Sequence, residues 1–302
     1  MDRRSFHDEI AKNKRSSLLL ASTLTIFIII LAYTIAYLFA PEYLIVVLPV
    51  TLLVMIGYSY SSWMYGDQVV LSATGAKPAE GREHLYLRDT VEGLSIAAGI
   101  PPPKVYVVPS DEINAFATGR DPEHASVAVT QGLVDALDRQ ELEGVLAHEM
   151  SHIRNRDITF MTLVAVLVGL TAILSHIILR TYRYGGLRGR RGRREKGGRL
   201  ETAILIVGFF LAIFAPILTR IVQFAVSRRR EFLADASGAE LTRYPDGLAS
   251  ALEKIMHHNT GEMNVSEAVS HLFISDPNRS PLDSLYATHP PIEERIRRLR
   301  AM

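Results

Sequence analysis

The stretch that decides the fold is residues 138–153, DRQELEGVLAHEMSHI. Asp138, followed three residues later by Glu141, has the form of a capping box and predicts that a helix begins here. Apolar residues then recur at helical spacing and give this helix one buried face: Leu142, Val145, Leu146 and Ile153. The sequence therefore places residues 148–152 within a helix.

Inside this helix, residues 148–152 read HEMSH, the pattern H-E-x-x-H. His148 and His152 are four residues apart, so both imidazoles lie on one helix face and can ligate the same metal ion. Glu149 lies beside them, placed to take a proton from water that the ion activates and to pass it to a leaving amine. Because so short a pattern also arises by chance, a third ligand is needed to make the site specific.

Glu231 and Asp235, an acidic pair that is also four residues apart, supply a candidate for that ligand. Two His and one Glu leave the fourth position of a zinc ion open, which is typical of catalytic zinc. Asp235 would then accept the free ring N–H of His148 or His152. The alternative is an exposed helix face on which both carboxylates pair with the basic residues 228–230. The first interpretation predicts one Zn²⁺ per chain.

The composition excludes other kinds of chemistry. The 302 residues contain no cysteine, which excludes a disulfide framework, a thiol nucleophile and a cysteine-ligated metal. Lys and Arg number 33 against 32 Asp and Glu, a net charge of +1, so no nucleic-acid partner is expected. The mean hydropathy of +0.14 is high for a chain with this many charges, which indicates that the apolar residues are clustered.

The apolar residues are clustered in four runs, namely residues 18–40, 43–66, 158–179 and 202–219. At about 1.5 Å per residue, the first run is roughly 34 Å long as a helix, enough to cross a hydrocarbon core of about 30 Å. Soluble core helices of such length usually carry a polar face, and these runs do not. We therefore predict about four membrane helices, and a lipid bilayer as one partner of the chain.

The charges beside the runs predict the orientation. Lys and Arg precede the first run but are missing from the turn at Pro41 and Glu42, which places the N-terminus in the cytoplasm. The loop 180–199 carries nine Lys or Arg and would lie outside if both later runs cross, against the same rule. Either this loop is translocated, which we favour, or the last two runs form a hairpin that enters without crossing. His152 and Glu231 share one side of the membrane in both cases.

Residues 67–157 are predicted to form a globular unit. A helix is expected over 82–98, ended by Gly99 and the prolines after it. Strand-like stretches at 104–108, 113–118 and 125–130 predict a small sheet. The chain thus divides into four parts: a transmembrane hairpin (1–66), a first catalytic part with the H-E-x-x-H helix (67–157), a second transmembrane hairpin with the Arg-rich loop (158–227) and a second catalytic part with the third zinc ligand (228–302).

Taken together, these features resemble the HtpX-type membrane zinc metalloproteases, a heat-shock family, and more distantly the CAAX prenyl proteases of type 1. The resemblance also covers NAFATG at 114–119 and HPPIEERI at 289–296. It implies a mainly α fold of about four integral membrane helices and a cytoplasmic, zincin-like (gluzincin) catalytic domain with a small β-sheet. It implies zinc ligation by His148, His152 and Glu231, with Glu149 as the catalytic base.

The resemblance further implies an edge strand that holds an extended substrate, formed by Asn114, Ala115, Phe116, Ala117 and Thr118. It implies that His289 and Arg295 stabilise the tetrahedral intermediate. The expected function is that of a multi-pass zinc metalloendopeptidase of the cell membrane, involved in the stress response. Its active site would face the cytoplasm and cut membrane or misfolded proteins. The alternative is a catalytically silent metal-binding scaffold or sensor, against which the intact Glu149 argues.

Overall fold

The computed structural model describes residues 41–166, 228–278 and 289–302, together with single positions between 15 and 37 and at 168–169. The predicted run 202–219 and the basic loop 180–199 lie outside these residues, as do most of run 18–40 and the second half of run 158–179. The described part is mainly helical. Its helices are α2 (Leu44–Ala73), α3 (Leu85–Ala98), α4 (Gln131–Ala136), α5 (Arg139–Arg154), α8 (Arg228–Thr242), α9 (Pro245–His258), α10 (Glu267–Ser270) and α11 (Ile292–Leu299).

Besides the helices, the described part contains a small mixed β-sheet. Its strands lie in the order β1 (Lys77–Pro78), β2 (Lys104–Val108), β4 (Ala125–Thr130) and β3 (Ala115–Gly119). The β2–β4 pair is parallel, whereas β1–β2 and β3–β4 are antiparallel. The prediction of a small sheet is confirmed, with the middle predicted strand shifted from 113–118 to 115–119. β3 therefore lies at one edge of the sheet.

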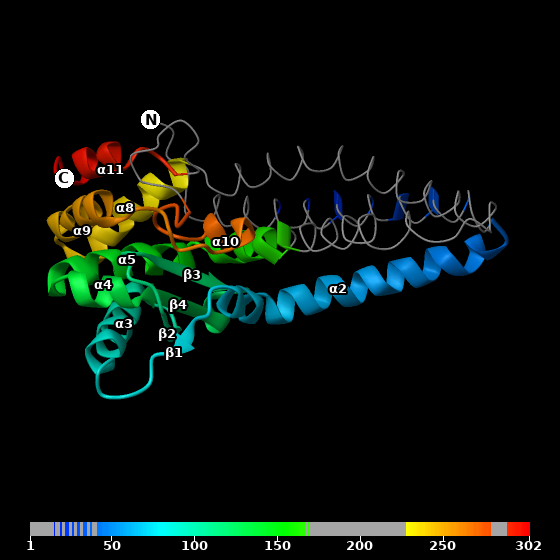
Figure 1. Ribbon diagram of the computed structural model, residues 1–302, viewed down its shortest axis with the longest axis horizontal. Coiled ribbons are helices and arrows are strands. Elements are labelled where there is room, and N and C mark those ends of the chain that lie inside the picture. Colours follow the sequence, from blue (N-terminus) through cyan, green and yellow to red (C-terminus); the bar gives the residue numbers. More distant parts are fainter. Residues whose placement is uncertain are drawn as a thin grey trace, which may run out of the picture.

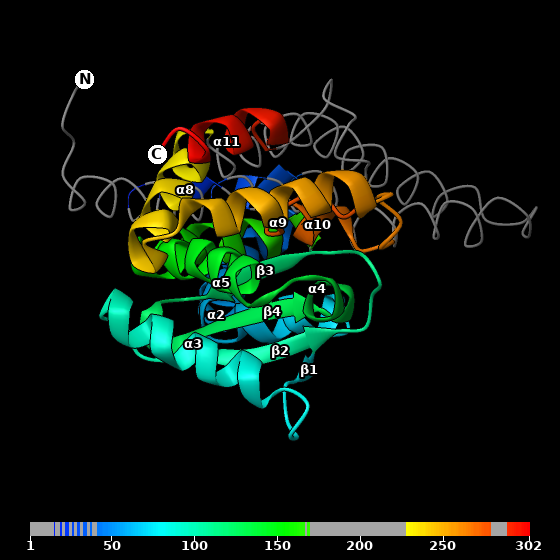
Figure 2. The same ribbon diagram turned by 90° about the vertical axis from the view of Figure 1, so that its left-hand side faces the viewer.

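The two faces of the sheet are covered by different helices. One face packs on α3 and α5. α8 and α9 pack on α5, and α11 packs on α9 and α8 as the outermost helix (Figures 1 and 2). The other face packs on the end of α2, on the helical residues Asp157–Val166 and on the segment around α10. Side chains alternate along β3, so Ala115 and Ala117 point toward α5 while Phe116 joins the second core.

α5 begins where the sequence predicts. The Asp138 carboxylate accepts from the Glu141 backbone N–H at 2.9 Å, and the Glu141 carboxylate accepts from the Asp138 N–H at 2.8 Å, which completes the capping box. Two glycines let other helices approach the backbone closely. A Cβ at Gly144 would lie 2.5 Å from the backbone nitrogen of Leu248 in α9, and one at Gly238 in α8 would lie 3.0 Å from that of His148. Close packing of α8 on α5 brings Glu231 and Asp235 to the histidines.

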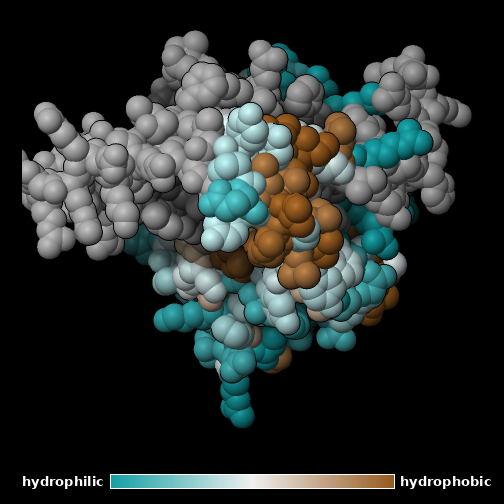
Figure 3. Space-filling model, turned by 90° about the vertical axis from the view of Figure 1, so that its right-hand side faces the viewer, coloured by the Kyte–Doolittle hydropathy of each residue, from teal (hydrophilic) through white to brown (hydrophobic). Residues whose placement is uncertain are grey.

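α2 projects away from the sheet and from the helices that cover it (Figure 1). Within the described part, the helical segment Pro41–Ala73 is the single one long and apolar enough to cross a membrane, with a mean hydropathy of 2.0 over its most apolar window. Its apolar side chains are exposed, Ile45 to 87% and Leu53 to 73%, and this end of the molecule presents a hydrophobic surface (Figure 3). The helix continues seven residues beyond the predicted end at Gly66, and its last turns bury Val70 and Leu71 against the sheet.

Candidate metal centre

Three side chains from two helices converge on one point. The metal-ligating atoms of His148, His152 and Glu231 lie within 4.8 Å of one another, and all three residues are buried. The two Nε2 atoms are 3.3 Å apart, and each lies 3.6–3.8 Å from a Glu231 carboxylate oxygen. Ligands about 2.0–2.1 Å from a zinc ion in tetrahedral geometry are separated by roughly 3.3–3.5 Å, so this spacing fits zinc.

Unsatisfied polar atoms surround the same point. Glu149 Oε1, Glu231 Oε2 and both ring nitrogens of His289 are buried and make no hydrogen bond to the described residues. Buried polar atoms in folded proteins nearly always have partners, so a cluster of exceptions indicates a place for an ion and a polar substrate. The donor set of imidazoles and carboxylates is one that zinc accepts.

The ring of His148 is held by what we call the inner arm, namely His148, Asp235 and Arg295. His148 Nδ1 lies 3.0 Å from Asp235 Oδ1, and Arg295 binds both oxygens of that carboxylate at 2.7 and 3.0 Å. Burial opposes ionisation of Asp235, but Arg295 and His148 together hold its pKa below the usual value. Because Asp235 occupies Nδ1, Nε2 of His148 is left to face the metal position.

The ring of His152 is held by the outer arm, namely His152, Asp157 and Arg230. His152 Nδ1 lies 3.1 Å from Asp157 Oδ2, and Arg230 Nε lies 3.8 Å from the other oxygen. No motif in the sequence points to Asp157. It follows His152 by five residues, beyond a turn in which Arg156 has a φ of 57°, so helical spacing does not connect the two. Its position as a single carboxylate directly before the apolar run 158–179 is the sequence feature that could have indicated its role.

Glu149 projects from α5 toward the same point, beside β3. Burial raises its pKa to about 7, against the opposing charges of His152 and Arg295 and a hydrogen bond from the Ala117 backbone. A bound cation would lower this value. A carboxylate with a pKa near neutrality can both accept and return a proton at cellular pH, as a general base requires.

His289 and Arg295 reach the site from the C-terminal segment. His289 Nδ1 lies 3.4 Å and Arg295 Nη1 3.7 Å from Glu231 Oε2. Arg295 is 1% exposed, although it belongs to a stretch of basic residues that would read as solvated. The structure therefore brings together all the residues for which the sequence predicts catalysis or metal binding, and Asn114–Thr118 lie alongside on β3 and directly before it.

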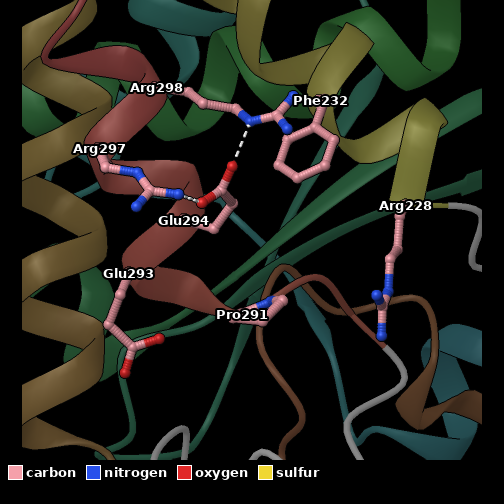
Figure 4. Close-up of a pocket in the computed structure, with 7 residues that line it drawn as sticks. All are labelled: Arg228, Phe232, Pro291, Glu293, Glu294, Arg297 and Arg298. Carbon is pink, nitrogen blue, oxygen red and sulfur yellow. Dashed lines mark hydrogen bonds and ion pairs between the residues drawn. The ribbon is translucent and has the colours of Figure 1, made fainter.

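A separate pocket of about 570 Å³ lies between α8 and α11 (Figure 4). Phe232 and Arg228 line it from α8, whereas Glu231 and Asp235 of the same helix face α5. The Arg298 guanidinium lies 3.8 Å above the Phe232 ring, and Glu294 pairs with both Arg297 and Arg298. Two of the three arginines that line the pocket, Arg297 and Arg298, are thus paired with Glu294.

A buried His₂Glu set beside an ionisable glutamate defines the class of the protein as a metallopeptidase. Comparison with known proteins gives the family: residues 82–302 match the model of peptidase family M48. The chain is 48% identical to a protease HtpX homolog of Caldanaerobacter subterraneus over 81% of both chains, and 42% identical to one of Thermoanaerobacter pseudethanolicus over 100% of this chain and 99% of the relative. It belongs to peptidase family M48, which is zinc-dependent, and is a membrane-bound metalloprotease acting on polypeptides.

A solved structure shares the fold. The crystal structure of Ste24p from S. mikatae is similar with a TM-score of 0.50 at 21% identity; the match covers 97% of this chain and 66% of that one. The expected resemblance, the enzyme class and the membrane association are thus confirmed, and nothing in these comparisons favours a catalytically silent scaffold.

Proposed function

We propose that this chain is a zinc metalloendopeptidase in which His148, His152 and Glu231 hold one Zn²⁺. The observation that carries the proposal is the convergence of three buried ligands within 4.8 Å beside a carboxylate oxygen, Glu149 Oε1, that has no hydrogen-bond partner among the described residues. Zinc bound there supplies Lewis acidity, which polarises a carbonyl and lowers the pKa of water. Side chains of the protein carry out the proton transfers, hold the ligands and stabilise the developing charge.

Each of these side chains has a distinct part. Glu149 takes the proton from the attacking water and delivers it to the leaving amine. Asp235 and Asp157 hold the two imidazoles in the tautomer that leaves Nε2 free. His289 and Arg295 donate to the scissile carbonyl oxygen as negative charge develops on it. The burial of Arg295 supports this role, because a positive group stabilises developing negative charge more strongly in a site without water than in water.

The substrate in this proposal is an extended polypeptide laid along the edge of β3, on residues 114–118. Such strand addition recognises main-chain groups, so it requires an unfolded or locally unfolded segment rather than a particular sequence. The buried Glu149 beside Ala117 supports the placement, because a peptide on this edge has its backbone next to the proposed base. Membrane proteins and misfolded proteins present such segments.

For the membrane, we propose four crossings with the active site on the cytoplasmic side, and catalytic parts at 67–157 and 228–302 between and after two hairpins. The exposed apolar surface of α2 and the basic residues before residue 18 support this orientation. A single cysteine at Gly192 in this cysteine-free chain tests it with an impermeant label. Labelling from the cytoplasmic side alone would rule out four crossings.

The activity is tested by zinc content and digestion of an unfolded model protein in detergent. Glu149→Gln should retain zinc and lose about 10²–10⁴-fold in cleavage rate, the usual contribution of a general base. Glu143→Gln is the matched control, since Glu143 lies on the same helix but pairs with Arg139 at the surface. Cleavage by Glu149→Gln at the wild-type rate would reject the proposal.

A further inference from the structure

The outer edge of β3, on which the proposed substrate lies, contacts another part of this chain. Phe273 lies opposite Phe116 in an antiparallel bridge, and the two rings are 4.7 Å apart. The Ile274 backbone N–H donates to the Ala115 carbonyl at 2.9 Å. Residues 272–275, which follow α10, thus run alongside the edge strand as an added strand would.

The neighbouring main-chain groups of this segment are also bound by residues of the site. Arg295 Nη1 donates to the Ile274 carbonyl at 3.0 Å. The Asn114 side chain donates to the Ser275 carbonyl at 2.9 Å and accepts from the Ser275 N–H at 3.3 Å. Ala115, Asn114 and Arg295 are the groups to which the proposed function assigns the substrate, and here they hold two consecutive residues of the chain itself.

The same guanidinium links this segment to the metal centre. Arg295 donates to the Ile274 carbonyl through Nη1, binds Asp235 through Nη2 and Nε, and lies 3.4 Å from His148 Nδ1. A peptide held by Arg295 therefore lies directly beside the proposed zinc ligands. Residues 272–275 occupy that position, and a second chain cannot form the same hydrogen bonds while they remain.

We propose that residues 272–275 are an internal occupant of the substrate site, a strand that must leave β3 before a polypeptide can bind. The inference rests on the proposed function, because it takes the β3 edge as the place of the substrate. Main-chain recognition does not distinguish an internal strand from an external one. The measured affinity for a peptide is then the intrinsic affinity multiplied by the fraction of molecules whose edge is open.

The burial of the segment makes the closed form the favoured one. Phe273 and Ile274 are 1% and 2% exposed, and each packs into one of the two cores. Beyond the segment, the Asn278 side chain fastens the chain to both backbone groups of Val265, at 2.9 and 3.1 Å. This anchor lies outside the catalytic machinery, so loosening it changes the opening equilibrium and leaves the catalytic groups in place.

A disulfide across the bridge tests the proposal directly. Residues directly opposite each other in antiparallel strands have Cα atoms about 4.5–5.5 Å apart, a separation that a disulfide spans, and the natural chain has no cysteine to interfere. In the double variant Phe116→Cys/Phe273→Cys, oxidation should lower kcat/KM for an unfolded model protein at least about tenfold, and reduction should restore it. The reduced double variant is the reference, and zinc content should be equal in both forms.

Equal cleavage by the oxidised and reduced forms would overturn the proposal, and failure of the two thiols to pair would overturn the strand register itself. The Asn278→Ala variant gives an independent measurement. Loss of two partly exposed hydrogen bonds from the closed form should lower KM about fivefold with kcat unchanged. An unchanged or higher KM would show that the segment is a permanent strand of the sheet.

A third measurement separates this inference from the proposed function. In the Glu149→Gln background, binding of a fluorescent unfolded peptide to the oxidised and reduced cysteine pair requires no catalysis. Tighter binding to the reduced form supports the internal occupant even if the chain cleaves nothing, whereas equal binding refutes it. Absence of cleavage by the wild-type chain would instead refute the proposed activity.

Discussion

The inner and outer arms hold the two histidines of one motif in similar ways but with different parts of the chain. In both, a buried carboxylate lies 3.0–3.1 Å from Nδ1 of the histidine, and an arginine also contacts the carboxylate. The inner arm joins α5, α8 and α11. The outer arm joins His152 to Asp157 and Arg230, which lie on either side of the predicted second transmembrane hairpin (158–227).

The arms also differ in how tightly the charges are joined. Arg295 binds Asp235 at 2.7 and 3.0 Å with both carboxylate oxygens engaged, whereas Arg230 Nε lies 3.8 Å from Asp157. The residues of both arms are buried, so we expect the shorter contacts of the inner arm to contribute more to the free energy of unfolding. The outer arm lies at the two ends of the predicted second hairpin, so we expect the position of His152 to be sensitive to changes in that hairpin.

The largest effect is expected from breaking the inner arm. Asp235→Asn removes the carboxylate that Arg295 binds through two hydrogen bonds and leaves the more distant Glu231, 3.7 Å away, as its nearest counter-charge. Removing one partner of a buried pair lowers the free energy of unfolding by about 3–5 kcal/mol. Thermal unfolding of the chelator-treated protein measures this without any contribution from zinc. Asp246→Asn is the control, because Asp246 pairs with Arg300 at the surface and should contribute less than about 1 kcal/mol. Equal unfolding temperatures for the two variants would contradict the expected contribution of the inner arm to the free energy of unfolding.

The inner arm also shows where sequence reasoning succeeds. The capping box at Asp138 and the spacing of His148 and His152 are local, so the helix and its ligand face follow from adjacent residues. The acidic pair Glu231 and Asp235 is local in the same way. The packing of Gly238 on α5 brings the two helices together. The sequence predicts this contact only indirectly, because the zinc site requires a third ligand.

Local patterns do not predict features that depend on distant parts of the chain. The residues around Arg295 read as a basic helix, so only the family resemblance pointed to a role for it, and its burial depends on Asp235, sixty residues earlier. Gly66 resembles a helix end, but it lies within α2, where a Cβ would meet Thr162 at 3.0 Å. The pairing of Phe116 with Phe273 joins positions with no common motif. Local patterns predict which element forms and which of its faces is apolar, whereas only packing decides which part of the chain that face contacts.

Breaking the outer arm should affect metal binding more than folding. Asp157→Asn retains a hydrogen-bond acceptor for His152 but removes the charge that orients the ring, and loss of such a partner weakens metal affinity by about 10–100-fold. Zinc competition with a chromophoric chelator measures this in detergent. The loss of unfolding free energy should be smaller than that of Asp235→Asn, because the Arg230 contact is longer.

The matched variant Asp157→Glu restores a carboxylate at the same position. It should recover part of the zinc affinity, whereas a purely packing role for Asp157 would make the larger side chain at least as harmful as asparagine. A zinc affinity of Asp157→Asn within about threefold of wild type would contradict the outer arm as a determinant of metal binding.

The smallest effect concerns the helix that Asp157 begins. His271 is fully buried, and its Nε2 lies 3.1 Å from the Met161 carbonyl on that helix. Burial lowers its pKa to about 4, against the hydrogen bond to Met161, from a value of 6.5 in the unfolded chain. A depressed folded-state pKa stabilises the protein above pH 6.5, and this stability is lost as the pH falls toward 4.

At pH 5.5, one unit below the unfolded-state value, His271 should therefore lower the free energy of unfolding by about 1.4 kcal/mol relative to pH 7.5. His271→Gln keeps a donor for Met161 without a titrating ring, so its unfolding temperature should fall less than that of wild type between the two pH values. His258→Gln, at an exposed position of α9, should follow wild type. If His271→Gln loses as much stability as wild type between the two pH values, protonation of another group destabilises the protein. The contact between residue 271 and Met161 is then not the one that protonation breaks.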